Sequence, residues 1–273
     1  MDNLSADGIG RLAIIGAGAM GAAFAKGVIG ARIVEPSEVM LADVDESKLD
    51  KCSALGCYVT TNNSEAAGYA DVILLAVKPA LVSTVLSEMA VAIGSHKLLV
   101  SIAAGVKIAA IEKQVGPDTP VIRAMPNTPC RIGCGAIGFS LGTSASSRHA
   151  AIAERLFGAV GLAVEVPERL LDAVTGLSGS GPAYVYVMIE ALSDAGVRVG
   201  LPRDLSLKLA AQTVMGAAKM VLVEYEHPAR LKDQVTSPGG TTIAGLDALE
   251  RAGFRSAIIE AVKAATNRAE ELG

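Results

Sequence analysis

Three glycines near the N-terminus have the spacing of a phosphate-binding turn. They stand in Gly16-Ala-Gly18-Ala-Met20-Gly21, directly after an apolar stretch and before an amphipathic one. Glycines allow a tight turn and let a pyrophosphate approach the backbone, while the following helix supplies free N–H groups and the positive end of its dipole. The G-x-G-x-x-G spacing in this context predicts dinucleotide binding. A tight turn in a non-binding α/β protein is the alternative.

A carboxylate follows at the expected end of the next strand. Asp43 lies 22 residues after Gly21. A carboxylate there can accept hydrogen bonds from both hydroxyls of an adenosine ribose, and it would repel a 2′-phosphate. An ordinary exposed aspartate is the alternative interpretation.

Two further segments could contact ligands. Ala76-Val77-Lys78-Pro79 stands at the end of an apolar stretch, and ligands in open α/β sheets bind at the carboxyl ends of strands. Ser237-Pro-Gly-Gly-Thr-Thr242 combines small residues and hydroxyls immediately before a helical pattern, which suits a carboxylate. A simple strand exit and a flexible linker with a threonine cap are the respective alternatives.

A third segment, Ser178-Gly-Ser-Gly-Pro-Ala183, opens a long helical pattern with Pro182 at its first position. Its residues fit a hinge followed by a helix cap.

The elements that must position these residues change character along the chain. Apolar runs predict strands at 11–15, 39–42, 72–77, 98–102, 121–124 and 135–139, with helices at 22–29 and 48–55. Continuous apolar strands alternating with helices indicate a parallel sheet covered on both faces. From about Val166 only helices are expected, at 182–195, 203–224, 242–251 and 254–272, with Gly196 and Gly200 ending the first of them.

Two of the later helices, expected at 182–195 and 203–224, are too apolar for an ordinary surface. In the first, the only charges are Glu190 and Asp194, which lie on one line. Between Leu205 and Val223 the only charges are Lys208 and Lys219, which fall on one narrow stripe with Gln212. A helix that is apolar nearly all round must be buried nearly all round, and a unit of this size cannot do that alone. The pattern therefore predicts a homodimer with interlocked helical domains.

Composition narrows the function classes. The net charge of −4 provides no basic field for nucleic acid, and no uncharged apolar run predicts a membrane span. The segment Met1–Gly10 lacks the basic region of a signal peptide, so a cytoplasmic location is expected. Cys52, Cys57, Cys130 and Cys134 are expected to be ordinary reduced cysteines, with a zinc site as the weaker alternative and no metal predicted.

Taken together, the motifs resemble those of the pyrroline-5-carboxylate reductase family, from Ile15 to about Leu272. The most specific stretches are Ala76–Pro79, Arg123-Ala-Met-Pro-Asn-Thr-Pro129, Thr175-Gly-Leu-Ser-Gly-Ser-Gly-Pro-Ala-Tyr184 and Lys232-Asp-Gln-Val-Thr-Ser-Pro-Gly-Gly-Thr-Thr-Ile243. The resemblance implies an α/β Rossmann domain, a doubly wound parallel sheet over 1–167, and an all-helical dimerisation and substrate-binding domain over 168–273. It also implies dimers that assemble further into a pentamer of dimers, a decamer.

The resemblance also implies which residues contact each ligand. Substrate binding is expected at Glu168, Ser237, Gly240, Thr241 and Thr242, with Thr242 hydrogen-bonding the ring nitrogen as the catalytic residue. Residues expected at NADPH or NADH are Ile15, Gly16, Ala17, Gly18, Ala19, Met20, Gly21, Asp43, Asn63, Ala76, Val77, Lys78, Pro79, Ile102, Ala103 and Ala104.

The implied reaction is reduction of the imine of 1-pyrroline-5-carboxylate to L-proline, the last step of proline biosynthesis. An iminium already carries its proton, so no strong general acid is required, and catalysis can rest on positioning and electrostatics. The acidic run Asp43-Val-Asp-Glu46 departs from family members that use NADPH, so we expect good use of NADH, although Ser47 and Lys48 could fold over a phosphate.

Two other functions compete with this one. In a β-hydroxyacid dehydrogenase, Gly176, Gly179 and Gly181 would align with the start of the second domain, but Val185 stands where that family has a lysine base. A dinucleotide-sensing protein without turnover is the other alternative, and the intact Gly240-Thr-Thr242 argues against it. Oxidation of reduced cofactor in the presence of pyrroline-5-carboxylate distinguishes all three.

Overall fold

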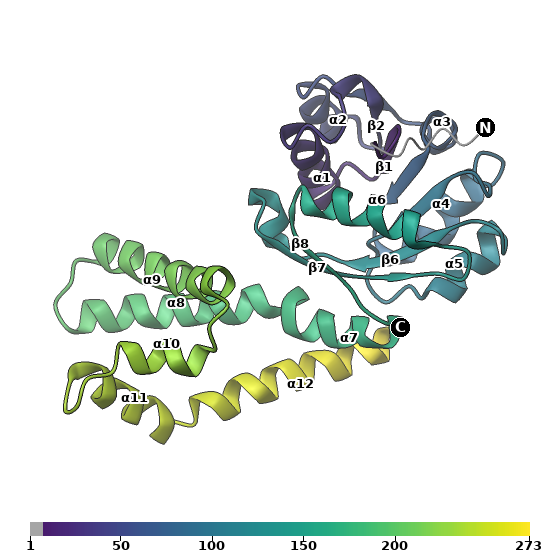
Figure 1. Cartoon of the computed structure of the whole chain (residues 1–273). Helices are drawn as coiled ribbons and strands as arrows, with labels where there is room; N and C mark the ends of the chain where they lie inside the picture. The colour runs from purple at the N-terminus through teal and green to yellow at the C-terminus, as the bar shows by residue number, and fades with distance from the viewer. Residues whose placement is uncertain (1–7) are drawn as a thin grey trace. The chain divides into compact units, whose positions relative to one another are not determined.

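The computed structural model describes residues 8–273 and divides into two compact units. The first unit is Met1–Ser180 together with Ala265–Gly273, and the second is Gly181–Ala264 (Figure 1). The N-terminal segment considered as a signal peptide lies largely outside the described residues. The predicted domain boundary at residue 167 stays a prediction beside this division.

The first unit contains an eight-stranded sheet in the order β3-β2-β1-β4-β5-β6-β7-β8. Its strands are Leu12–Ile15 (β1), Val39–Ala42 (β2), Tyr58–Thr60 (β3), Val72–Leu75 (β4), Leu98–Ser101 (β5), Val121–Met125 (β6), Gly135–Leu141 (β7) and Gly161–Glu165 (β8). Every residue of β1, β4 and β5 is buried, which explains their uninterrupted apolar sequences. In the register of β1, Ile14 lies opposite Leu41 of β2 and Leu74 of β4.

One pair departs from the expected parallel arrangement, because β7 runs antiparallel to β6. Only residues 126–134 connect these two strands, whereas a parallel crossover needs about a dozen residues or more. The alternation of apolar runs indicates where strands lie but does not specify their direction at this connection. The strands β3 and β8 were not predicted, and both lie at the edges of the sheet.

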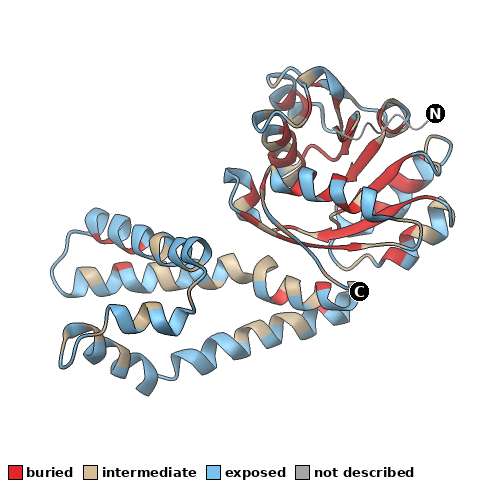
Figure 2. Ribbon diagram, in the orientation of Figure 1, coloured by how far each residue is buried: buried red, intermediate tan, exposed pale blue. Residues whose placement is uncertain are grey.

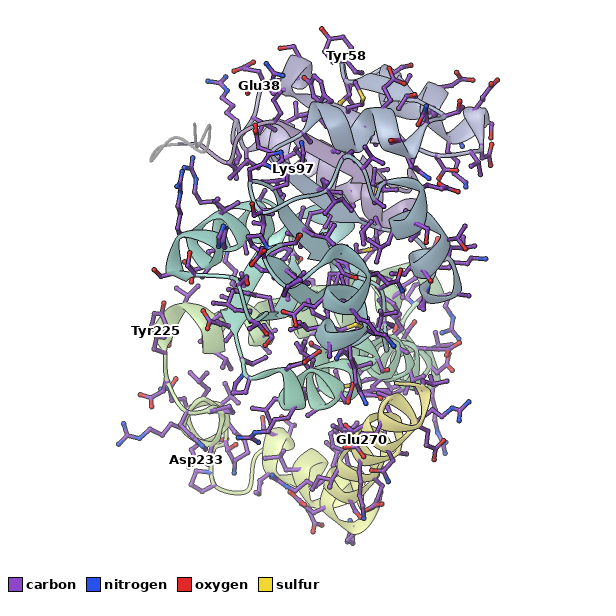
Figure 3. The ribbon with its side chains drawn as sticks, turned by 90° about the vertical axis from the view of Figure 1, so that its right-hand side faces the viewer. Glu38, Tyr58, Lys97, Tyr225, Asp233 and Glu270 are labelled. Atoms are coloured by element: carbon purple, nitrogen blue, oxygen red, sulfur yellow. The ribbon has the colours of Figure 1, made fainter. Side chains whose placement is uncertain are left out.

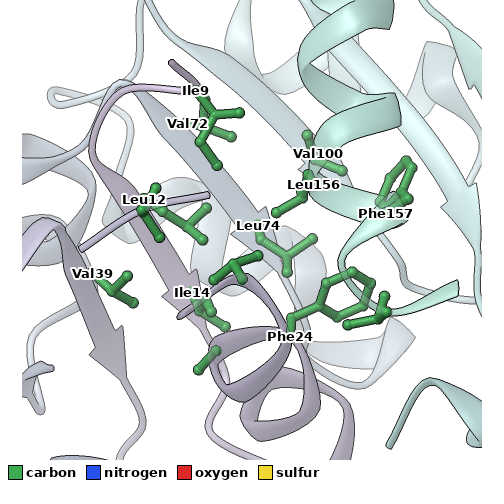
Figure 4. Packing of buried hydrophobic residues seen from close by; sticks show 14 of the residues in the cluster. Ile9, Leu12, Ile14, Phe24, Val39, Val72, Leu74, Val100, Leu156 and Phe157 are labelled. Carbon is green, nitrogen blue, oxygen red and sulfur yellow. The ribbon is translucent and has the colours of Figure 1, made fainter. Parts of the chain in front are cut away.

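Helices cover both faces of the sheet, which makes it doubly wound. They are Ala19–Gly30 (α1), Glu46–Ser53 (α2), Asn63–Tyr69 (α3), Val82–Glu88 (α4), Ile108–Val115 (α5), Ser147–Gly158 (α6) and Leu171–Val174 (α7). On one face Phe24 of α1 and Phe157 of α6 pack over Ile14 and Leu74 (Figure 4). Leu86 of α4 belongs to the second core, on the other face.

The second unit is helical. Its helices are Gly181–Arg198 (α8), Arg203–Glu224 (α9), Pro228–Gln234 (α10), Thr241–Arg251 (α11) and Phe254–Leu272 (α12), the last of which continues into the first unit. The prediction that Gly196 ends a helix is wrong, because α8 continues to Arg198. A Cβ on Gly196 would overlap Ser206 Oγ, so this glycine permits the close crossing of α8 and α9.

Burial is uneven between the units. Figure 2 shows the buried residues concentrated in the sheet and its helices, whereas the second unit is mostly exposed. Leu207, Leu209 and Leu222 of α9 are among its exposed large apolar side chains. By length and composition alone α9 could cross a membrane, and it is the only helix in residues 8–273 that meets that test. Apart from the side that packs on α8, where Ser206 and Ala210 are buried, the apolar side chains predicted for this helix are therefore largely exposed within one chain.

Candidate functional site

Each glycine of the turn between β1 and α1 has a structural reason. Gly16 and Gly21 lie too close to other backbone atoms for a side chain, and Gly18 faces open space. Gly16 has φ +104°, and a Cβ there would lie 2.6 Å from the carbonyl oxygen of Ala76. A Cβ on Gly21 would overlap the carbonyl oxygen of Gly16, so α1 packs directly on the turn. Nothing lies within 4 Å of the position that a Cβ on Gly18 would take, which leaves the space that a phosphate needs.

The start of α1 is left open for an anion. Gly18 is the N-cap residue and provides no side-chain cap, and the first helical hydrogen bond runs from Ala22 N–H to the Gly18 carbonyl. The N–H groups of the first turn therefore face outward at the positive end of the helix dipole. This geometry fits the pyrophosphate of a dinucleotide.

A cavity of about 350 Å³ lies beside this turn, at the carboxyl ends of β1, β2 and β4. Seven of the predicted cofactor residues line it: Gly16, Gly18, Asp43, Asn63, Ala76, Val77 and Lys78. Five other lining residues were not among the predicted cofactor residues: Ala42, Val44, Lys48, Leu81 and Val85. Of these five, Lys48 is the only one that carries a charge, and the sequence had indicated it only as a residue that could fold over a phosphate.

The other predicted cofactor residues do not line this cavity. Ile15, Ala17 and Gly21 are buried beneath the turn, and Ala19 and Met20 begin α1. Pro79 begins the turn after Lys78, and Ile102, Ala103 and Ala104 follow the carboxyl end of β5. Their contact with the dinucleotide stays a prediction.

Asp43 is held firmly at the end of β2. Its Oδ2 accepts a hydrogen bond from Ala17 N–H at 2.9 Å, and its Oδ1 accepts one from Asp45 N–H at 3.0 Å. The Lys48 ammonium lies 3.1 Å from Oδ1 and 3.3 Å from Oδ2. The alternative of an ordinary exposed aspartate does not hold, because only 10 % of the Asp43 side chain is exposed.

The helix that presents Asn63 to the cavity is fixed at both ends. At its start, Asn62 Oδ1 accepts hydrogen bonds from the backbone of Ser64 and Glu65. At its far end, the buried Lys97 donates to the Ala70 carbonyl, and burial lowers the pKa of its ammonium (Figure 3). The side chain of Asn63 donates to Glu88 Oε2 at 2.6 Å, which ties α3 to α4.

The predicted carboxylate site lies in the second unit, at the start of α11. Gly240 is its N-cap residue and no side chain caps the helix. The first helical hydrogen bond comes from Ala244 N–H, so the backbone N–H groups of Thr241, Thr242 and Ile243 precede it. Gly240 N–H donates to the Ser237 carbonyl at 3.1 Å, which closes the loop before the helix.

Glu168, the remaining predicted substrate residue, lies in the first unit. Its Oε1 accepts a hydrogen bond from Ile108 N–H at 2.7 Å, at the start of α5, and lies 3.2 Å from Arg123 Nη1. Arg123 is buried and also pairs with Asp172. These contacts give Glu168 a structural role, and its contact with substrate stays a prediction.

The cysteines are free thiols, and Cys52, Cys57 and Cys130 are buried. Burial raises the pKa of Cys57 to about 11, which disfavours the reactive thiolate. Within residues 8–273 no group of histidine, cysteine and acidic side chains could hold a metal ion.

Both parts of the chain match known protein families. Residues 168–272 match the family model for pyrroline-5-carboxylate reductase dimerisation, and residues 11–105 match the model for coenzyme F420-dependent NADP oxidoreductases. A pyrroline-5-carboxylate reductase of Synechocystis is 48 % identical over 264 residues, which cover 96 % of this chain and 98 % of that protein.

Solved structures agree over the same span. A pyrroline-5-carboxylate reductase of Coxiella burnetii superposes with a TM-score of 0.93 at 35 % identity, covering 97 % of this chain and 99 % of that one. A pyrroline carboxylate reductase of Plasmodium falciparum with NADP bound has a TM-score of 0.85 at 34 % identity, covering 100 % of this chain and 99 % of that one.

Proposed function

The chain belongs to the pyrroline-5-carboxylate reductase family, and on that premise we propose that it reduces 1-pyrroline-5-carboxylate to L-proline. A reduced nicotinamide dinucleotide, NADPH or NADH, supplies the hydride when bound. The hydride adds to the imine carbon, and the protonated ring nitrogen becomes the secondary amine of proline. The observation that carries this proposal is the cavity beside the glycine turn, at the strand ends where Asp43 and Ala76 meet it.

We assign the substrate carboxylate to the start of α11. The three N–H groups of its first turn and the positive end of the helix dipole support this assignment, since both favour an anion. Thr242 is half-buried there, and its hydroxyl is assigned to the ring nitrogen. Because the iminium brings its own proton, these residues need only hold and orient it, and positioning supplies most of the catalysis.

We further propose that the protein works as a homodimer in the cytoplasm, with residues 168–273 as the dimerisation domain. The match of 168–272 to a dimerisation model and the uncovered apolar side chains of α9 support the dimer. A pentamer of dimers is the assembly that the family resemblance adds.

The decisive experiment follows the absorbance of NADPH or NADH on addition of pyrroline-5-carboxylate, with L-proline identified as the product. Steady oxidation of the reduced cofactor is expected. Oxidation of a β-hydroxyacid by the oxidised cofactor would favour the dehydrogenase alternative, although Val185 cannot act as the base which that reaction needs. Cofactor binding without turnover on any of these substrates would favour a sensing role.

A further inference from the structure

Lys48 lies at the edge of the dinucleotide cavity, beside Asp43 and Val44. It is on the first turn of α2, five residues after Asp43 and six beyond the end of β2. Its ammonium contacts Asp43 Oδ1 at 3.1 Å and is 3.6 Å from Asp45 Oδ2. Since 43 % of its side chain is exposed, it can move away from these partners without breaking the core. The hydrogen bond to Asp43 raises the pKa of Lys48, which favours its charged form further.

The carboxylate of Asp43 has no free hydrogen-bond acceptor position while Lys48 contacts both of its oxygens. A carboxylate offers about four acceptor directions. The backbone N–H groups of Ala17 and Asp45 take one on each oxygen, and the ammonium approaches both oxygens from the remaining side. Two ribose hydroxyls can therefore be accepted only after Lys48 withdraws. The ammonium has three N–H groups, so it can donate to a ligand while it still contacts Asp43.

We propose that Lys48 is the specificity-determining residue for the adenosine ribose, and that its ammonium binds the 2′-phosphate of NADP(H). Asp43 then serves two purposes. With NADP(H) it is a positioning residue that holds the ammonium at the cavity, and with NAD(H) it accepts the ribose hydroxyls after Lys48 moves aside. This inference rests on the proposed function only in that the cavity binds a nicotinamide dinucleotide.

The charges near the end of β2 explain why Lys48 alone can decide whether a 2′-phosphate binds there. Asp43, Asp45 and Glu46 bring three negative charges to the end of β2, and a phosphate would be repelled by all of them. Lys48 offsets one of these charges and provides the contact that a phosphate needs. Lys78 also lines the cavity, but it stands at the end of β4. It is therefore expected to act on both dinucleotides alike.

The test measures binding of NADP⁺, NAD⁺ and 2′,5′-ADP to the full-length protein by calorimetry, without substrate. In Lys48→Met the Kd for NADP⁺ and for 2′,5′-ADP should rise about tenfold or more, as for loss of a charge-assisted hydrogen bond. NAD⁺ should bind equally or more tightly. Lys51→Met, on the exposed side of the same helix, is the matched control and should leave all three affinities unchanged.

Two outcomes would overturn the inference. Lys48→Met could leave the ratio of NADP⁺ to NAD⁺ affinity unchanged, or Lys78→Met could be the variant that changes it. The proposed reaction fails separately, if wild type binds dinucleotides with the expected Lys48 dependence yet does not reduce the imine. A wild-type protein that binds neither dinucleotide would contradict both.

Discussion

Thr242 is the single residue whose loss we expect to affect turnover most. Thr242 is at the start of α11, whose first backbone N–H groups are uncapped by any side chain and were assigned above to the substrate carboxylate. Thr242→Ala should lower kcat with pyrroline-5-carboxylate by about 5- to 150-fold, which corresponds to about 1–3 kcal/mol for one buried hydrogen bond. The Kd for the dinucleotide should not change. Thr242→Ser retains the hydroxyl and should recover most of the activity, whereas full activity in the alanine variant would refute the assignment.

Asp43 is expected to reduce the preference for the phosphorylated cofactor. Its carboxylate repels a 2′-phosphate by an energy on the order of 1 kcal/mol per close charge near a protein surface. Asp43→Ser removes this repulsion and the acceptor of the NAD(H) ribose hydroxyls, whereas Lys48 keeps its charge at the cavity. The ratio of kcat/KM for the two cofactors should therefore shift toward NADPH by several-fold. Asp43→Asn serves as the control that keeps an acceptor for Ala17 N–H.

One kinetic outcome would contradict the role assigned to Asp43. If the wild type already prefers NADPH by about a hundredfold and Asp43→Ser leaves that ratio unchanged, Asp43 does not read the ribose.

At the scale of elements, the start of α6 should make stability depend on pH. Ser146 is the N-cap residue of this helix, and its N–H donates to His149 Nδ1 at 2.9 Å in a capping box. Burial lowers the pKa of His149 below the usual 6.5. The unfolded chain therefore binds more protons in the window between the folded pKa and 6.5, and the free energy of unfolding should fall as the pH drops through it.

The matched variant is His149→Gln, because glutamine can occupy the third position of a capping box but does not titrate. Denaturant unfolding at a series of pH values should show a shallower loss of stability in this variant below pH 6.5. Equal slopes for the two proteins would mean that His149 does not contribute to the pH dependence.

At the scale of the whole molecule, the exposed apolar helix α9 predicts that the protein is at least a dimer at micromolar concentration. Leu209→Glu places a charge among its exposed apolar side chains and should shift the sedimentation coefficient toward the monomer with loss of stability. Lys208→Glu puts the same side chain on the polar stripe of the helix and should leave the dimer intact. A stable wild-type monomer at micromolar concentration would contradict the prediction.

Much of the molecule follows from sequence alone because the signals are local. The glycine turn, the buried runs of β1, β2 and β4, and the limits of α9 and α12 were predicted within a few residues. Each is set by spacing along the chain: a glycine where the backbone must turn, apolar runs where a strand is covered on both faces, and a proline or glycine at a helix end. The same local patterns carry the family resemblance.

The tertiary structure decided what depends on residues far apart in the chain. The antiparallel direction of β7 follows from a short connection, and Gly196 lies inside α8, where its missing side chain leaves room for α9. Most of all, Asp43 looked like a free carboxylate from sequence. Only the fold brings Ala17 N–H from the glycine turn and the ammonium of Lys48 to its two oxygens. A residue type can suggest a ligand, but hydrogen bonds to groups brought in by other elements determine whether its atoms are available to bind it.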